Sequence, residues 1–375
     1  MALATKHTRT PRAKPVRFAV IGLGHIAQVA VVPAFAHAEP RARLQAIVSG
    51  DAEKLREVGD RYDVPSRGGY DDLERLLAEC AAAYIATPNS EHVTHAVRAA
   101  RAGVHVLCEK PLAATTDDAR AMIGACREAG VLLMTAYRLH FDPLAIEALS
   151  RVRAGDIGDV KYFASSFSMT VKPGNIRTRP DLGGGTLYDL GVYCINAART
   201  TLGGEPTQVF AHAAPGDRAG LPGIDEMTSA VLVFDNGRHA TFTTSFAAAD
   251  VSSFRVVGTD GDLVMQPAYE YVDPLEYTLT SGGRPLHRKG RRRDQFAAEI
   301  LYFADCIRQG RAPEPSGEEG ARDVRIVEAL YESAQRGEPI ALPSDGHEPG
   351  PDEGQARDEP PVAKPPLVNV EPPHD

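Results

Sequence analysis

The apolar, strand-length run from Val16 to Ile21 leads directly into the sequence Gly22 to Ala27, which reads G-L-G-H-I-A. A G-x-G-x-x-A pattern where a strand turns into a helix is typical of a dinucleotide-binding site. The glycines permit a tight turn and close approach of a pyrophosphate, and the helix N-terminus offers free N–H groups to that anion. A glycine turn can also merely pack a helix on a strand, but the strand and the helical pattern are both present. We assign to the cofactor site Gly22, Gly24, His25 and Ile26.

Strands and helices alternate after this turn. Further apolar runs of strand length occupy residues 44–49, 82–87, 104–108 and 131–136, and helical patterns separate them at residues 52–62, 72–79, 91–102 and 116–129. Alternation of this kind predicts right-handed crossovers and a parallel sheet that is buried on both faces. We therefore expect a doubly wound α/β Rossmann domain over residues 16–137, preceded by a flexible basic arm at residues 1–15.

The end of the second strand indicates which dinucleotide is preferred. An NAD site usually has a carboxylate here for the ribose 2′-hydroxyl, whereas an NADP site needs a neutral or basic environment for the 2′-phosphate. Ser49 stands at this position, and Lys54 lies within reach of the same phosphate. NADP is therefore expected over NAD. Asp51 and Glu53 argue mildly for NAD, and the sequence does not say which way they point.

A lysine stands where the fifth strand should end, in the run Cys108-Glu109-Lys110-Pro111. At the carboxyl end of such a strand, Lys110 would point into the crevice that holds a nicotinamide ring. It is a candidate acid or base, although E-K-P alone is often a surface turn.

The second half of the chain changes its pattern. Strand-like stretches at residues 160–171, 208–214, 227–234, 239–246, 254–257 and 263–266 are divided by short turns, and helical patterns follow at residues 295–308 and 318–336. Short turns between successive strands indicate a mainly antiparallel sheet. We expect an α+β substrate-binding domain over residues 138–343, with a large open sheet and a capping box of Ser316 and Glu319 at its last helix.

Three glycines, Gly183 to Gly185, precede a helical stretch that carries Asp189 and Tyr193. Residues four apart lie on one helix face, so the two side chains can bracket a hydroxyl-bearing carbon. A phenol handles protons near neutral pH only where a positive charge favours the phenolate, and Lys110 could supply that charge. We take Lys110, Asp189 and Tyr193 as catalytic. The alternative is that Asp189 and Tyr193 only cap and pack a helix.

Several motifs together resemble the glucose-fructose oxidoreductase, inositol dehydrogenase and MocA family, most of all its glucose-fructose oxidoreductase branch. They are G-L-G-H-I-A, V-S-G-D-A-E-K, T-P-N-S-E-H, C-E-K-P-L, A-Y-R-L-H-F-D-P and G-G-G-T-L-Y-D-L-G-V-Y, and the resemblance spans residues 16–341. It implies cofactor-binding roles for Thr87, Pro88, Asn89, Glu109 and Lys110, and substrate-binding roles for Tyr137, Arg138, Arg177, Asp189 and Tyr193.

The resemblance has one departure and two further implications. Most relatives have histidine where this chain has Tyr193, and His92 of the T-P-N-x-x-H pattern is expected to orient a helix start rather than do chemistry. In the family the open sheet commonly carries subunit contacts, which implies a homodimer or homotetramer.

Composition excludes several other classes. The chain has no run of 18 apolar residues, and its five cysteines show no C-x-x-C spacing. We therefore expect a reduced cytoplasmic protein without a membrane span, disulfide framework or metal site. No apolar segment follows the first basic residues, so no secretory signal is expected. The net charge of −9 gives no reason to expect nucleic-acid binding, and the basic cluster from His287 to Arg293 is expected to be a solvated loop.

The C-terminal end differs in composition from the rest. Residues 345–375 contain eight prolines, eight acidic residues and only two basic residues. Such a segment has little apolar surface to offset its ordering entropy, so residues 344–375 are expected to be a disordered acidic tail.

These expectations combine into an NADP-dependent oxidoreductase that transfers a hydride between the nicotinamide and a sugar, by aldose oxidation at the anomeric carbon, ketose reduction or both. Two alternatives stay open. One is a relative that acts on a cyclitol, an anhydro sugar or a dihydrodiol, and the other is a non-catalytic regulator that keeps the nucleotide-binding fold.

Overall fold

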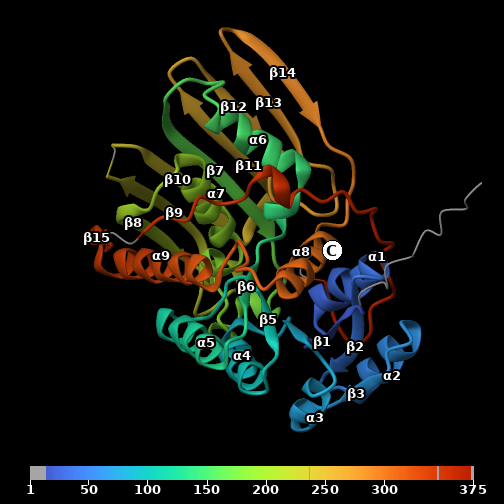
Figure 1. Ribbon diagram of the computed structural model, residues 1–375. Coiled ribbons are helices and arrows are strands. Elements are labelled where there is room, and N and C mark those ends of the chain that lie inside the picture. Colours follow the sequence, from blue (N-terminus) through green and yellow to red (C-terminus); the bar gives the residue numbers. More distant parts are fainter. Residues whose placement is uncertain (1–13, 236, 344–345, 373–375) are drawn as a thin grey trace, which may run out of the picture.

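Two sheets organise the chain, with helices around and between them (Figure 1). The computed structural model describes residues 14–235, 237–343 and 346–372. Residues 1–13, which make up most of the expected basic arm, lie outside the described residues, as do the tail residues 344, 345 and 373–375.

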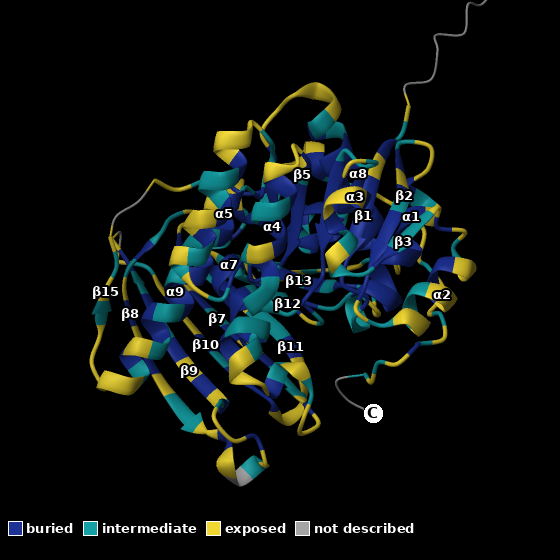
Figure 2. Cartoon of the chain, turned by 90° about the horizontal axis from the view of Figure 1, so that it is seen from below, coloured by how far each residue is buried: buried dark blue, intermediate teal, exposed yellow. Residues whose placement is uncertain are grey.

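The first sheet is wholly parallel and has six strands in the order β3-β2-β1-β4-β5-β6. Its strands are β1 (Val16–Ile21), β2 (Ala42–Val48), β3 (Ser66–Gly68), β4 (Ala82–Ile85), β5 (His105–Glu109) and β6 (Leu133–Ala136). Helices cover both faces: α1 (Val32–Ala38), α2 (Ala52–Arg61), α3 (Leu73–Leu77), α4 (His92–Arg101) and α5 (Thr116–Ala129). The strands are buried (Figure 2), as apolar strands covered on both faces should be, and the predicted Rossmann sheet is confirmed. Only the three-residue β3 was missed.

The second sheet has nine strands in the order β14-β13-β12-β11-β7-β10-β9-β8-β15. They are β7 (Val160–Thr170), β8 (Pro206–Pro215), β9 (Asp225–Phe234), β10 (His239–Ser245), β11 (Ala247–Gly258), β12 (Gly261–Met265), β13 (Glu276–Ser281), β14 (Arg284–Lys289) and β15 (Ile340–Ala341). All neighbours are antiparallel except β7 and β10, which run parallel. The expected open, mainly antiparallel sheet is therefore confirmed. The expectation of a loop at residues 287–293 is wrong in part, because residues 287–289 belong to edge strand β14.

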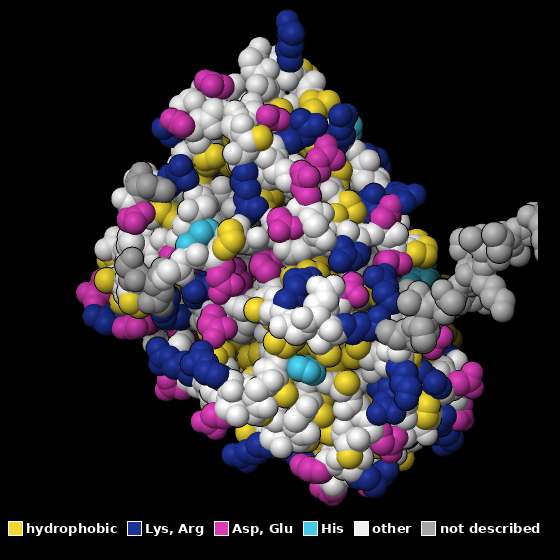
Figure 3. All heavy atoms as spheres, in the orientation of Figure 1, with side chains coloured by type: hydrophobic (Ala, Val, Ile, Leu, Met, Phe, Trp, Pro, Cys, Tyr) yellow, Lys and Arg dark blue, Asp and Glu magenta, His cyan; other side chains and the backbone are white. Residues whose placement is uncertain are grey.

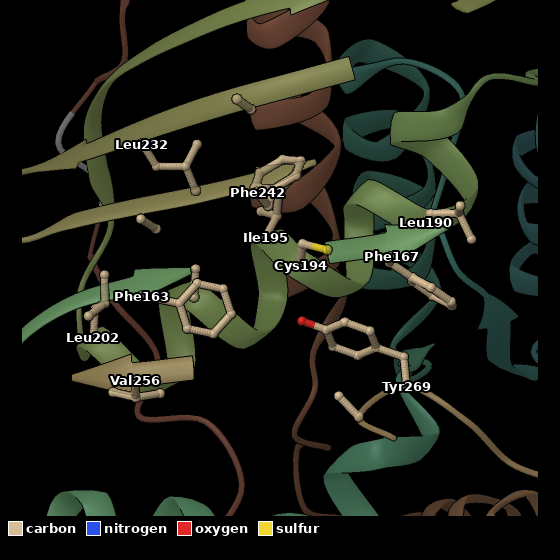
Figure 4. Close-up of a cluster of buried hydrophobic side chains, with 14 of the residues drawn as sticks. Phe163, Phe167, Leu190, Cys194, Ile195, Leu202, Leu232, Phe242, Val256 and Tyr269 are labelled. Atoms are coloured by element: carbon tan, nitrogen blue, oxygen red, sulfur yellow. The ribbon is translucent and has the colours of Figure 1, made fainter. Parts of the chain in front are cut away.

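The remaining helices are α6 (Pro143–Arg153), α7 (Val192–Leu202), α8 (Gln295–Gln309) and α9 (Gly317–Arg336). At α6, α8 and α9 the N-cap side chain accepts backbone N–H groups, and Ser316 Oγ accepts from Glu319 N at 3.0 Å, as the capping pattern predicts. An apolar core lies between β7, α7 and the loop after β12, and it includes Phe167, Cys194 and Tyr269 (Figure 4). This packing fixes the position of α7. α7 forms the C-terminal part of the helical stretch that was predicted to carry Asp189 and Tyr193.

The last helices of the chain return to the nucleotide-binding domain. α8 packs in one core with β1 and α1, where the rings of Phe18 and Phe303 lie 6.4 Å apart. α9 lies against α5 as well as β8. The expected division at residue 137 therefore does not separate the two cores, because a helix from the second half of the chain completes the first.

The expectation of a disordered tail is wrong for residues 346–372. Val368 is buried against the first core, and Asp358 accepts a hydrogen bond from Arg293 Nε at 2.8 Å. Arg153 Nη1 donates to the carbonyl of Pro351 at 2.7 Å. Composition misled because a few apolar residues and charged partners at complementary positions are enough to bind an extended segment, even in an acidic, proline-rich stretch.

Among the described residues, no helix is long and apolar enough to cross a membrane. The described part of the chain also holds no group of three or more His, Cys, Asp or Glu side chains placed to bind a metal ion. On the face shown in Figure 3, side chains of both charge signs are interspersed.

Candidate active site

The glycine turn has the geometry that a pyrophosphate requires. Gly22 has φ of +93°, and a Cβ atom there would lie 2.7 Å from the carbonyl oxygen of Ala86, so only glycine fits. Gly24, His25 and Ile26 are half-buried at the start of the helix that follows. That helix begins with a π-helical turn, Ala27–Val31, before α1. Thr87 Oγ1 is buried nearby and has no hydrogen-bond partner among the described residues. A free backbone cradle and an unpaired hydroxyl fit a bound dinucleotide.

The structure answers the question of where the acidic residues after β2 point. Asp51 Oδ1 caps α2 by accepting from the backbone N–H groups of Glu53 at 2.9 Å and Lys54 at 3.1 Å. The hydrogen bond from Lys54 N is the main cause that lowers the pKa of Asp51. Ser49 is buried, and its Oγ accepts from Asp51 N at 3.1 Å, which leaves the hydroxyl proton free to donate to a ligand. Lys54 is half-buried on the first turn of α2.

The T-P-N motif links the two halves of the chain. Asn89 Nδ2 donates to the carbonyl of Gly183 at 2.8 Å, so the end of β4 is tied to the glycine run of the second half. The His92 ring nitrogens lie 3.0 Å from the carbonyl oxygen of Thr87 and 3.1 Å from that of Pro111. His92 is fully buried, which agrees with an orienting role. Pro88 is half-buried between these contacts.

The three residues taken as catalytic lie together. Lys110 Nζ donates to the carbonyl oxygen of Asp189 at 2.9 Å and to its Oδ1 at 3.0 Å, and it lies 4.7 Å from the centre of the Tyr193 ring. Asp189 Oδ2 accepts from Arg177 Nε at 2.7 Å. Asp189 thus holds two cations in place, one on each carboxylate oxygen.

Electrostatics follow from this geometry. Burial disfavours the charge on Asp189, but Arg177 and Lys110 outweigh burial and hold its pKa below the ordinary value. Burial likewise opposes the charge on Lys110, but Asp189 outweighs it and the pKa of Lys110 is raised. Both groups are therefore charged at neutral pH.

A second cation lies against Tyr193. The guanidinium of Arg138 is 5.1 Å from the centre of the Tyr193 ring and 5.2 Å from that of Tyr271. Arg138 donates to the side chain of Gln295 and to the backbone carbonyls of Tyr269 and Glu270. The ring of Tyr193 therefore lies close to both Lys110 and Arg138, and Arg138 is fixed by its own partners.

Tyr137 does not join this group through its hydroxyl. Its O–H donates to Asp323 Oδ2 at 2.5 Å, inside a buried cluster where Arg199 pairs with Asp323 and Glu319. Burial and the charge of Asp323 raise the pKa of Tyr137 well above its ordinary value. The expected substrate contact of Tyr137 therefore does not fit its placement: the hydroxyl braces α9 instead. Arg138, the next residue, faces Tyr193.

Glu109, which was expected in the cofactor site, shares a buried tyrosine with Glu299, a residue that the sequence analysis missed. Tyr84 Oη lies 2.8 Å from Glu109 Oε1 and 2.7 Å from Glu299 Oε1. A hydroxyl has one proton to donate, so one of the two carboxyl groups must itself be protonated. Burial raises the pKa of both carboxyl groups, but the charge of Lys110 opposes the rise at Glu109, whereas the charge of Glu109 adds to it at Glu299, so we assign the proton to Glu299. Glu109 also accepts the backbone N–H of Lys110 at 3.2 Å.

Comparison with known proteins gives the family. Residues 16–137 match the model of an oxidoreductase family with an NAD-binding Rossmann fold, and residues 146–264 match the Gfo/Idh/MocA C-terminal domain. The chain belongs to the Gfo/Idh/MocA oxidoreductase family. This confirms the resemblance drawn from the motifs, and with it the enzyme class.

Several relatives are named for sugar chemistry. A D-xylose 1-dehydrogenase (NADP(+)) of Haloferax volcanii is 36% identical over 87% of this chain and 99% of its own. The structure of an aldose-aldose oxidoreductase from Caulobacter crescentus, complexed with glycerol, is 35% identical with a TM-score of 0.83 and covers 88% of this chain and 100% of its own.

A more distant structure carries the cofactor. A 3-ketoreductase from Actinomadura kijaniata in complex with NADP and TDP-benzene is 30% identical, has a TM-score of 0.78, and covers 85% of this chain and 98% of its own. Further structures of that enzyme carry a replacement of one tyrosine by phenylalanine and of one lysine by alanine.

Proposed function

We propose that this chain is an NADP-dependent sugar oxidoreductase that oxidises an aldose at its anomeric carbon, reduces a ketose, or couples the two. The observation that carries the proposal is the cluster of Lys110, Asp189 and Tyr193, built where β5 ends and α7 begins. Relatives named for NADP(+), for xylose and for paired aldoses support the cofactor and the substrate class.

The residues divide the reaction between them. Oxidation of a hydroxyl-bearing carbon releases a hydride and a proton, and oxidised NADP held in this site would supply the hydride acceptor. Tyr193 is placed to take the proton as the C–O bond becomes a carbonyl, with the Lys110 ammonium 4.7 Å from the centre of its ring. In the reverse direction Tyr193 returns the proton to the new alkoxide. The tyrosine and lysine replaced in the Actinomadura enzyme have nearly the same spacing along that chain as Lys110 and Tyr193, which supports the pairing.

Other residues position these groups. Asp189 and Arg177 fix the ammonium of Lys110, and Gly22, Gly24, Ser49, Lys54 and Thr87 would hold the dinucleotide. Asn89, through Gly183, ties the cofactor side to the substrate side. Arg177 is half-buried beside Asp189, where it could also donate to a sugar hydroxyl.

A two-part experiment tests this proposal. Absorbance and mass analysis of the purified protein shows whether NADP or NADPH survives gel filtration, which would favour coupled turnover of two sugars without cofactor release. Initial rates with aldoses, ketoses, cyclitols, anhydro sugars and dihydrodiols under NADP and NAD then identify the substrate class. Highest kcat/KM with a cyclitol, an anhydro sugar or a dihydrodiol would replace the aldose assignment. Absence of NADP binding and of turnover with every polyol would favour a regulator instead.

We also propose that the outer face of the nine-stranded sheet joins two copies of the chain. Tyr162, Phe210 and Met227 lie on β7, β8 and β9 and are 45%, 39% and 42% exposed, although they are large and apolar. Large apolar side chains that are exposed on one open sheet face favour association. Light scattering on the protein and on a variant with Phe210 and Met227 replaced by Lys would test it, because the variant should be monomeric. An unchanged mass would exclude this face.

A further inference from the structure

The C-terminal segment Pro366–Asn369 lies against the nucleotide-binding domain. Gln28 Nε2 donates to the carbonyl of Val368 at 2.9 Å, and Val368 N donates back to Gln28 Oε1 at 2.8 Å. The Val368 side chain is 6% exposed and joins the core of the first sheet, and Leu367 packs beside it. Arg61 Nη1 donates to the carbonyl of Pro366 at 2.7 Å. Two reciprocal hydrogen bonds and a buried side chain are the marks of specific docking.

This docking places the segment at the adenosine end of the dinucleotide site. Gln28 follows Gly24 by one helical turn, and its backbone N–H donates to the carbonyl of Gly24 at 3.1 Å. Arg61 and Asp51 stand at opposite ends of α2, so the segment runs along that helix toward its N-terminus. In a Rossmann domain the ribose and its 2′-substituent bind between this helix start and the end of β2, where Ser49 stands. The docked part of the tail therefore ends beside the expected position of the ribose 2′-substituent.

Asn369 acts on the two carboxylates that would oppose NADP there. Its Nδ2 donates to Asp51 Oδ2 at 3.0 Å and to Glu53 Oε2 at 2.9 Å. Both carboxylates lie near the expected position of a 2′-phosphate and would repel that group, which carries the same sign of charge. The Asn369 amide ties both to a neutral donor and holds them to one side. The backbone of Asn369 has φ of +49°, a conformation that asparagine tolerates better than most residues.

We propose that Asn369 and its segment are part of the cofactor site and set the preference for NADP over NAD. The proposal rests on the proposed use of a nicotinamide dinucleotide but not on which sugar is turned over. It places a specificity-determining residue outside residues 16–137, the part that matches the dinucleotide-binding family model. The matches to the sugar dehydrogenase and oxidoreductase relatives cover 99% and 100% of these two relatives but only 87% and 88% of this chain. The relatives therefore need not share the C-terminal segment.

The test measures cofactor binding directly, in the full chain and without sugar. Asn369→Asp keeps the size of the side chain but replaces the N–H donor with a third carboxylate. Asn369→Gly keeps the left-handed backbone and removes the amide. Lys364→Gln is the control: it changes the net charge by the same unit as Asn369→Asp, at an exposed residue of the same tail. Dissociation constants for NADP and NAD are determined by titration at low and moderate salt.

The expected result is selective. Asn369→Asp should weaken NADP binding about tenfold at low salt, the scale of one added charge near a phosphate, while NAD binding changes by less than about twofold. Asn369→Gly should have an intermediate effect, and Lys364→Gln none. An unchanged ratio of the two dissociation constants would overturn the proposal. So would an equal loss for both cofactors, which marks a purely structural role, or tighter NADP binding in both Asn369 variants, which marks a segment that competes with the cofactor. If the parent protein binds neither cofactor, the proposed function itself fails.

Discussion

The Lys110 ammonium nitrogen lies 4.7 Å from the centre of the Tyr193 ring, although the two residues come from different halves of the chain. Lys110 follows β5 of the parallel sheet, and Tyr193 lies near the start of α7, which packs on the antiparallel sheet. The proton-handling pair therefore exists only when the two halves are packed together. Asp189 makes this packing specific, because its carboxylate binds the lysine from across the interface.

Asp189→Asn should lower kcat and shift the pH dependence of kcat. Asp189 raises the pKa of Lys110, so removing its charge lowers that pKa and moves the basic limb of the kcat profile to lower pH. We expect kcat to fall at least about tenfold. A pH–rate profile that keeps the parent shape and position would show that Asp189 does not act through Lys110.

The same variant should also be less stable than the parent protein at neutral pH. The pKa of Asp189 is lower in the folded protein, so its contribution is complete above the unfolded value of about 3.9 and is lost as pH falls below it. Denaturant unfolding at about pH 7 should show a loss of at most about 3 kcal/mol, because two partly buried cations lose their partner. The difference from the parent should shrink as the pH is lowered toward about 3.

The stability of Glu299→Gln relative to the parent protein should increase as the pH rises. Glu299 is protonated in the folded protein, and an unfolded glutamate loses its proton near pH 4.3. Above that pH the folded state binds the extra proton, so this residue lowers stability by up to about 1.4 kcal/mol for each further pH unit. The amide can still donate to Tyr84 while Tyr84 donates to Glu109. Melting curves between about pH 5 and about pH 8 should show the melting temperature of the variant rising relative to that of the parent. A constant difference in melting temperature would mean that Glu299 is charged.

Deleting residues 346–375 should lower the melting temperature by several degrees. The deletion removes the burial of Val368, a contribution of about 1.5–3 kcal/mol, together with its hydrogen bonds to Gln28. A shorter deletion from residue 370 onward keeps those contacts and serves as the matched control. Equal melting temperatures for the parent and the longer deletion would restore the expectation of a disordered tail.

Ser49→Asp should shift the cofactor preference toward NAD by one or more powers of ten, on the order of 1–3 kcal/mol. The hydroxyl of Ser49 is free to donate at the end of β2, and a carboxylate in its place would repel the 2′-phosphate. The ratio of kcat/KM for NADP to that for NAD measures the shift. An unchanged ratio would remove Ser49 from the cofactor site.

Local patterns predicted the parts of the site that lie at element ends. Lys110 follows a strand, Gly22 and Gly24 join a strand to a helix, and Asp189 and Tyr193 are four residues apart in a helical stretch, so each carries a short-range signal. Two local features were not predicted: Ala27–Val31 and Leu187–Gly191 are π-helical turns, a distortion often found at functional sites.

Contacts between distant residues left no such signal. Tyr84 and Glu299 are 215 residues apart, and Gln28 and Val368 are 340 apart, so no spacing predicts that they meet. For the tail, average composition hid a local exception: Leu367, Val368 and Val370 form an apolar patch in an otherwise polar segment. For Tyr137, the motif gave the correct neighbourhood but not the direction of the hydroxyl, which depends on Asp323 in α9.

The most direct test of the account is the turnover of Tyr193→Phe, Lys110→Met and the double variant, measured with the best sugar. We predict that each single change lowers kcat roughly a hundredfold or more while NADP affinity changes little in Tyr193→Phe. The double variant should be scarcely slower than either single variant, because the two groups move one proton together. Near-normal kcat in both single variants would contradict the proposed site, and fully multiplicative losses in the double variant would contradict the joint action of Lys110 and Tyr193.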